Sequence, residues 1–322
     1  MEGAPTCNPA VTSPVESARP HVDENSIMVE TFEDVWGVYF HVSVYFVRQI
    51  YNLRIKRIGE GVKMPNFAAN LSMMFTEVEF TERFKVASDS GFKAVEYLFP
   101  YDYAKDQLVN LLRENDLLQV LHNLPAGDWN SGERGIACHP DRVSEFREGV
   151  GLAAEYASAL ACPQVNCLAG IKPESISDQE AQETFVANLQ YAAPIMKEVG
   201  VKLIVESINT IDIPGFFLNQ TNQAAELINM VGSDNLYLQH DIYHMQIMEG
   251  DLARTIESNI QLITHMQLAD NPGRHEPGTG EINYEYLFDF IDALGYQGWI
   301  GCEYVPAGST LDGLEWINPY IK

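Results

Sequence analysis

The 322-residue sequence has few positive charges. It contains 20 lysines and arginines against 45 aspartates and glutamates, which gives a net charge of -25 at pH 7. A surface of this sign repels the phosphates of nucleic acids and anionic lipids, so we expect no nucleic-acid partner. It also repels anionic metabolites. A small acid substrate would therefore need a local group of positive or hydrogen-bond-donating side chains.

Cysteines are also few, and the five present form no CxxC pair and no zinc-ligand spacing. An odd number of cysteines in a long chain predicts reduced thiols and a cytoplasmic location. Cys162 and Cys167 flank one predicted strand and Cys302 lies inside another. In such places cysteine behaves as a small buried hydrophobic residue.

Long apolar runs are missing as well. The most apolar stretch near the start, VWGVYFHVSVYFV at residues 35–47, is shorter than the roughly 20 residues that span a bilayer. Its flanks fit neither a signal anchor nor a cleavable signal, so a membrane role is not expected, and weak interfacial attachment is the alternative. Residues 1–30 are polar and without periodicity, which predicts disorder. We therefore predict an N-terminal extension, residues 1–63, and a catalytic domain, residues 64–322.

From Asn66 onward, apolar stretches alternate with helical patterns, several of which end before a glycine. The predicted helices are residues 81–90, 141–161, 178–199, 221–231 and 284–294. The predicted strands are residues 67–70, 94–97, 117–123, 164–168, 202–206, 236–241, 263–268 and 299–303. Eight such units in about 250 residues predict an α/β fold, the (β/α)8 TIM barrel. An open doubly wound sheet is the alternative, but no glycine-rich turn follows the first strand, so no nucleotide cofactor is expected.

An acid or amide closes each of the last four predicted strands: Glu206, Asp241, Gln267 and Glu303. The carboxyl ends of barrel strands meet at one mouth, where ligands bind. Oxygen donors of this kind suit a divalent metal such as Mg2+ or Mn2+. Several carboxylates close together are unfavourable unless a cation or shared protons neutralise them. The four residues therefore predict a single site that holds either a metal or shared protons.

Basic and imidazole side chains lie near the same strand ends. His122 ends the third strand, His244 follows Asp241 by three residues, and Arg274 lies in the Gly- and Pro-containing loop ADNPGRHEPGTGEINY. A stiff loop can hold a guanidinium against a carboxylate, so we predict that these three residues bind the substrate. Glu96, at the end of the second strand, is predicted either to orient the site or to form a buried ion pair.

Two loops and one missing motif bear on the chemistry. The loop HNLPAGDWNSGERGIACHP, which follows the third strand and contains Arg134, has the composition of a lid over the mouth or of an ordinary long connection. Neither this loop nor the one that carries Arg274 resembles a P-loop. No serine lies in a GxSxG turn, so acyl-enzyme chemistry has no support.

Over residues 64–322 the sequence resembles the hydroxypyruvate isomerase family, within the xylose-isomerase-like barrel superfamily. The matching blocks include FAANLSMMF, GFKAVEYLFPYDY, QHDIYHMQIMEG, RHEPGTGEINY and GWIGCEY. The resemblance implies interconversion of hydroxypyruvate and 2-hydroxy-3-oxopropanoate, with Glu206 and Glu303 as proton donor and acceptor. Related ketose epimerases bind a metal through Glu, Asp, His and Glu. Gln267 replaces that histidine here, whereas their Asp-x-x-His matches Asp241 and His244.

Other functions fit the same residues. A 2-oxo-tetronate isomerase or a ketose epimerase would use the same barrel and the same acids. A non-catalytic protein that binds small hydroxy acids is the alternative from another class, because a fold does not determine a function. A metal-dependent DNA-repair nuclease on this barrel is disfavoured by the negative charge. The expected partner is a small hydroxy-keto acid, and assembly into a homo-oligomer is left open.

Overall fold

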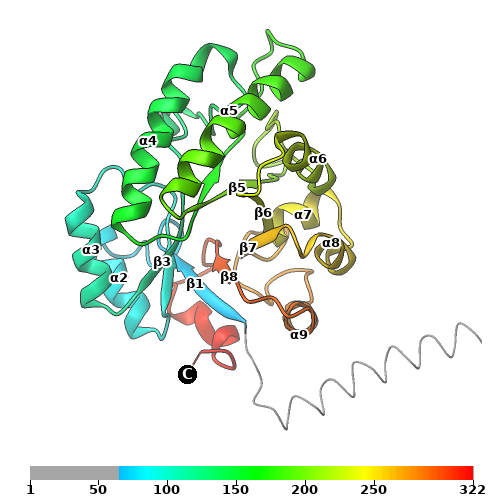
Figure 1. Ribbon diagram of the computed structural model, residues 1–322. Coiled ribbons are helices and arrows are strands. Elements are labelled where there is room, and N and C mark those ends of the chain that lie inside the picture. Colours follow the sequence, from blue (N-terminus) through cyan, green and yellow to red (C-terminus); the bar gives the residue numbers. More distant parts are fainter. Residues whose placement is uncertain (1–64, 322) are drawn as a thin grey trace, which may run out of the picture. The chain divides into compact units, whose positions relative to one another are not determined.

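The computed structural model describes residues 65–321, which form a closed barrel of eight parallel strands (Figure 1). Each strand pairs with its neighbours in the sequence, and β1 pairs with β8 to close the barrel. The strands are β1 Asn66–Asn70, β2 Ala94–Glu96, β3 Leu118–Asn123, β4 Gln164–Cys167, β5 Lys202–Glu206, β6 Leu236–Asp241, β7 Ile263–Leu268 and β8 Trp299–Cys302. The predicted (β/α)8 fold is therefore confirmed, and each predicted strand end agrees to within one residue.

Helices surround the barrel (Figure 1). The α-helices of the described residues are α2 Phe80–Asp89, α3 Lys105–Glu114, α4 Val143–Ala159, α5 Asp178–Glu198, α6 Thr221–Val231, α7 Ile242–Met248, α8 Leu252–Asn259 and α9 Tyr284–Ala293. The sequence patterns did not predict α3, α7 or α8. Helix α7 begins directly after β6, because the last residue of the strand, Asp241, is also the N-cap of the helix. Short 3-10 helices occupy Trp129–Ser131, Pro140–Arg142 and Asp312–Ile317.

The predictions for residues 1–63, including disorder and the apolar run, lie outside the described residues. Within residues 65–321, no helix combines the length and apolarity needed to cross a membrane. The four cysteines of this part, Cys138, Cys162, Cys167 and Cys302, are free and buried.

Inside the barrel, apolar residues lie in the middle of the strands and polar residues at their carboxyl ends. Ala68 and Ala94 belong to a small buried cluster, and the residues two positions further along are Asn70 and Glu96. Residues two apart on a strand share one face, so these polar side chains also face the barrel interior. The interior of the barrel therefore has apolar side chains at mid-strand and a layer of polar side chains at the carboxyl ends of the strands.

Gly301 of β8 makes room for the buried side chain of Glu96. A Cβ atom at position 301 would lie 2.2 and 2.3 Å from the two carboxylate oxygens of Glu96. That carboxylate cannot move away freely, because three side chains hydrogen-bond to it. We expect Gly301→Ala to lower the free energy of unfolding by about 1–3 kcal/mol, as overpacking usually does.

The measurement is urea unfolding of Gly301→Ala beside Gly151→Ala. Gly151 lies on α4, and a Cβ there would meet no atom within 4 Å. Alanine at this control position should stabilise the helix by about 0.5–1 kcal/mol. Equal stability of Gly301→Ala and the wild type would show that the Glu96 side chain is not held in place.

Candidate active site

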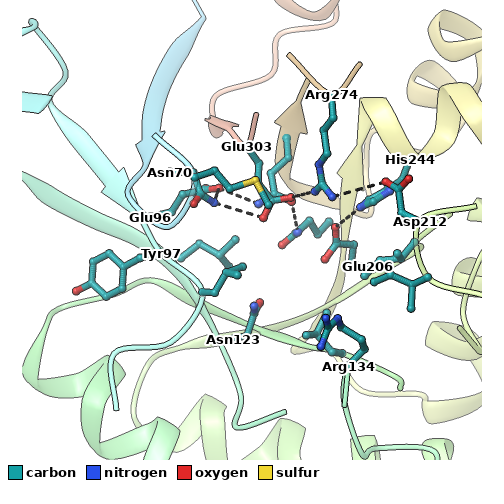
Figure 2. A pocket seen from close by; sticks show the side chains of 18 of the residues that line it. Asn70, Glu96, Tyr97, Asn123, Arg134, Glu206, Asp212, His244, Arg274 and Glu303 are labelled. Carbon is teal, nitrogen blue, oxygen red and sulfur yellow. Dashed lines mark hydrogen bonds and ion pairs between the residues drawn. The ribbon is translucent and has the colours of Figure 1, made fainter. Parts of the chain in front are cut away.

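A cavity of about 260 Å³ lies at the carboxyl ends of the strands (Figure 2). Its volume is below the roughly 300–1,000 Å³ of sites for drug-sized ligands, so it suits a small metabolite. Polar and charged side chains from strand ends and loops line it: Asn70, Glu96, Asn123, Arg134, Glu206, Asp212, Gln239, His244, Gln267, Arg274 and Glu303. Met73, Trp129, Ile208 and Ile213 are among its apolar neighbours.

The two predicted proton carriers, Glu206 and Glu303, both line this cavity and are buried. Asn166 donates its side-chain amide to Glu206 Oε2 at 2.8 Å. Glu303 Oε2 accepts from Arg274 Nη2 at 2.7 Å, and Glu303 Oε1 accepts from Asn70 Nδ2 at 3.3 Å. Each glutamate is therefore held by donors and has limited freedom to rotate.

Both glutamates are weaker acids than usual. Burial, and then the charges of Glu303 and Asp241, raise the pKa of Glu206 well above its ordinary value. Burial raises the pKa of Glu303 to about 8, against the opposing effect of Arg274. Without a bound cation, protons therefore remain on this pair at neutral pH. A pair that holds a proton can supply both a general acid and a general base.

Asp241 lies beside the two glutamates and also caps the N-terminus of helix α7. Its Oδ1 accepts hydrogen bonds from the backbone N–H groups of Tyr243 at 2.8 Å and His244 at 3.2 Å. Ligand atoms of Glu206, Asp241, His244 and Glu303 all lie within 4.8 Å of one another. The structure thus brings the three predicted carboxylates together at one point.

The hydrogen bonds of His244 determine which ring nitrogen carries the proton. Asn209 accepts the backbone N–H groups of Ile211 and Asp212 with its Oδ1, which leaves its amide nitrogen to donate to His244 Nδ1 at 2.6 Å. Burial lowers the pKa of His244 to about 4, so the ring is neutral at pH 7 and its Nε2 bears the hydrogen. His244 is therefore placed as a hydrogen-bond donor. A histidine that ligates a metal usually donates through its other nitrogen instead.

The carboxylates of Glu206, Asp241 and Glu303 fit a hard divalent cation. Three negative groups within a few ångströms need neutralisation, and oxygen ligands match Mg2+ or Mn2+. His244 could join them only by giving up the Nε2 proton that its bond with Asn209 favours.

Gln267 lines the cavity as part of a chain of side-chain amides. Its Nε2 donates to Glu96 Oε1 at 2.8 Å, and its Oε1 accepts from Gln239 Nε2. The amide oxygen that was predicted as a metal ligand is therefore already engaged, and its binding of a metal remains a prediction. At the end of this row of amides, the buried Oε1 of Gln239 has no partner among the described residues and is free to accept a hydrogen bond.

The carboxylate of Glu96 holds three neighbouring side chains in place. It accepts hydrogen bonds from Asn70 at 3.0 Å, Gln267 at 2.8 Å and His265 Nε2 at 2.7 Å. Asn70 in turn reaches Glu303 (Figure 2). Glu96 therefore positions Asn70 and Gln267, as one of the two alternatives predicts, whereas the buried ion pair remains a prediction.

Arg274 lies in the cavity as predicted, but two carboxylates already engage it. It contacts Glu303 at 2.7 Å and Asp212 at 3.8 Å (Figure 2). Its guanidinium lies 5.1 Å from the ring centre of Tyr243. Arg274 therefore orients Glu303 and balances its charge. Its contact with the substrate remains a prediction.

His122 requires a correction, because it does not line the cavity. Its strand neighbours Leu121 and Asn123 do, and successive side chains of a strand point to opposite faces. The His122 ring is buried 6.1 Å from that of Tyr101, and burial lowers its pKa to about 3. It is thus a neutral core residue rather than a substrate contact.

Several cavity residues were not predicted. Asn70 and Asn123 end β1 and β3, so they follow the same strand-end pattern as the four predicted acids and amides. Asp212 lies in the loop after β5 and opens the segment DIPGF, which belongs to the family resemblance but was assigned no role. The loop after β3 does border the cavity, through Trp129 and Arg134.

The family model of the xylose isomerase-like TIM barrel matches residues 84–320. Hydroxypyruvate isomerase of Escherichia coli (strain K12) is 52% identical over 257 residues, which is 80% of this chain and 100% of that protein. A 2-oxo-tetronate isomerase of Cupriavidus necator is 46% identical over 258 residues, 80% of this chain and 99% of that protein.

Solved structures agree on the fold. A crystal structure described as an AP endonuclease of family 2 from Brucella melitensis is 46% identical, with a TM-score of 0.79 over 80% of this chain and 100% of that chain. An L-ribulose 3-epimerase structure, 22% identical with a TM-score of 0.63, covers 80% of this chain and 86% of its own and shows the fold alone. From the family match and the curated relatives, this chain is an isomerase that acts on a small molecule, and it belongs to the xylose isomerase-like TIM barrel family.

Proposed function

We propose that the protein interconverts hydroxypyruvate and 2-hydroxy-3-oxopropanoate. The observation that carries the proposal is the pair of buried glutamates, Glu206 and Glu303, whose carboxyl groups approach within 4.8 Å in a cavity of about 260 Å³. The E. coli relative that is 52% identical bears the name of this activity. A site of this size and acidity fits a three-carbon hydroxy-ketone and the movement of one proton between its carbons.

The reaction needs a base at one carbon and an acid at its neighbour. One glutamate removes a proton from C3 of hydroxypyruvate, and the electron pair of the broken C–H bond forms the C2–C3 double bond of an enediolate. The C2 oxygen takes up the proton of the C3 hydroxyl, and as the C3–O bond becomes the carbonyl of the aldehyde, the electron pair of the C2–C3 double bond takes a proton from a glutamic acid to form the new C2–H bond. The raised pKa values of both glutamates suit this exchange of roles near neutral pH.

Neighbouring donors stabilise the charge that develops on the substrate oxygens. The Nε2–H of His244 and the guanidinium of Arg274 both face the cavity. Preorganised donors of this kind lower the barrier, because they need not rearrange as the charge appears. A divalent ion held by Glu206, Asp241 and Glu303 would add Lewis-acid stabilisation of the same oxygens.

A longer keto acid is the second candidate, because the Cupriavidus necator relative, 46% identical, is named a 2-oxo-tetronate isomerase. The chemistry at the reacting carbons would be the same, and the substrate would extend by one hydroxymethylene group. DNA cleavage has weaker support. The net charge of -25 opposes binding to a phosphate backbone.

Proton exchange in heavy water tests the proposal. We expect the enzyme to introduce deuterium at C3 of hydroxypyruvate and to form an aldehyde that a coupled reductase consumes. Competing hydroxypyruvate against 2-oxo-tetronates in one mixture compares kcat/KM directly, and hydroxypyruvate should be preferred. Preference for a tetronate would establish the second candidate. An absence of exchange with every keto acid would overturn the proposal and point to a different substrate for the isomerase.

A further inference from the structure

Arg134, the second arginine of the cavity wall, has no carboxylate partner within residues 65–321. Its Nη1 donates to two backbone carbonyls, those of Trp129 at 3.0 Å and Glu133 at 2.7 Å. Its guanidinium carbon lies 4.1 Å from the ring centre of Trp129. The remaining N–H groups, on Nε and Nη2, have no acceptor in this part of the chain. One edge of the guanidinium is therefore available to a ligand.

Arg274 differs in this respect. Its contacts with Glu303 and Asp212 already balance its charge. Figure 2 shows the two arginines on opposite sides of the pocket, with Glu206 between them. Arg274 has a buried Nε without a hydrogen-bond partner, but the neighbouring carboxyl groups of Glu303 and Asp212 disfavour a third carboxylate there. Arg134 has no such carboxyl partner among the described residues and is the better place for a negative group of the substrate.

The loop that carries Arg134 is held firmly on both sides of it. The preceding residue, Glu133, accepts from Arg142 Nη1 at 2.6 Å. The following residue, Gly135, has φ +115, and a Cβ there would lie 2.5 Å from the carbonyl oxygen of Leu168. Only glycine permits this approach to the loop after β4. Arg134 is therefore presented by an anchored loop, which reduces the entropy lost when a ligand binds.

We propose that Arg134 binds the carboxylate of the substrate through its Nε–H and Nη2–H edge, and so selects keto acids over uncharged hydroxy-ketones. This inference rests on the proposed function and revises the prediction that Arg274 binds the carboxylate. A carboxylate matches two parallel N–H groups of a guanidinium. It would also meet the need for a local positive group in a chain with a net charge of -25.

The test compares Arg134→Gln with the wild type on two ligands. With hydroxypyruvate, kcat/KM should fall roughly 100-fold, mostly through KM, because the substrate carboxylate loses its charged partner. D-glycerate has the carboxylate but no ketone, and its binding measured by calorimetry should weaken at least about tenfold. Arg134→Lys, which keeps the charge without the planar fork, should lie between. Dihydroxyacetone, which lacks the carboxylate, should exchange protons equally slowly with the wild type and with Arg134→Gln.

Arg147→Gln is the matched control, because Arg147 also lies over an aromatic ring, that of Tyr191 at 4.6 Å, but does not line the cavity. Unchanged KM and D-glycerate affinity in Arg134→Gln would overturn the inference, and so would an equal loss with dihydroxyacetone. If the glutamine variant does not fold, Arg134→Lys decides: weaker D-glycerate binding supports the inference, and unchanged binding overturns it. Failure of the proposed function is distinguishable. The wild type would then exchange no protons with any keto acid, yet would bind D-glycerate more tightly than Arg134→Gln.

Discussion

Glu206→Gln is expected to lower kcat roughly 10²–10⁴-fold, which is the usual contribution of a positioned general acid or base. Glutamine keeps the shape of the side chain and its hydrogen bonds but cannot carry the proton. The same change at Glu303 should have an effect of the same size. Turnover is measured by the coupled aldehyde assay.

The two variants should also reveal which glutamate acts first. The variant that lacks the base for C3 should introduce no deuterium at C3 of hydroxypyruvate. The variant that lacks the acid for C2 should still exchange the C3 proton while forming little aldehyde. Glu257→Gln, on the exposed side of α8, removes a carboxylate far from the cavity and should leave both rates unchanged.

Stability should not fall with activity. A carboxyl whose folded-state pKa is raised binds its proton more tightly in the folded protein. Its contribution therefore declines as the pH rises from about 4.5 toward the raised value, which is about 8 for Glu303. Glu206→Gln, which keeps an acceptor for Asn166, should therefore have a melting temperature at pH 8 equal to or above that of the wild type. Near-normal turnover in either variant would exclude that glutamate as an essential proton carrier.

Removal of divalent metal is expected to cause the second large loss of turnover. Prolonged dialysis against a chelator should leave a protein with little activity, and added Mn2+ or Mg2+ should restore it. The reason is the cluster of Glu206, Asp241 and Glu303, whose mutual repulsion a cation relieves. Elemental analysis before and after dialysis gives the metal content.

Thermal unfolding provides a readout that does not depend on turnover. An ion present at about 100 times its Kd stabilises the folded state by about 2.7 kcal/mol, so added Mn2+ should raise the melting temperature. Asp241→Asn should weaken this shift because it removes one anionic ligand. Full turnover in a metal-free preparation would contradict the requirement for a metal. The explanation left would be a proton shared between Glu206 and Glu303.

Strand positions and the general location of the site could be predicted because both follow local rules. Apolar stretches such as LIVES have to be buried on both faces, and eight of them with intervening helices close into a barrel. Parallel strands bring their carboxyl ends to one rim. Glu206 and Glu303 are therefore neighbours although 97 residues separate them, counting from 206 to 303.

The directions in which individual side chains point could be predicted less reliably than the strands themselves. His122 ends a predicted strand as plausibly as Asn123, but the pleat turns one toward the helices and the other into the cavity. A difference of one residue in register exchanges the two.

The sequence by itself determined the barrel, the acidic rim and the two glutamates, because hydrophobic periodicity and strand-end position are properties of short segments. Only the tertiary structure decided which polar groups have partners. Asn209 selects the protonated nitrogen of His244, Gln239 engages Gln267, and Glu303 neutralises Arg274 while Arg134 keeps an open edge. These pairings join residues from separate loops and strands, and their distances depend on the closed barrel.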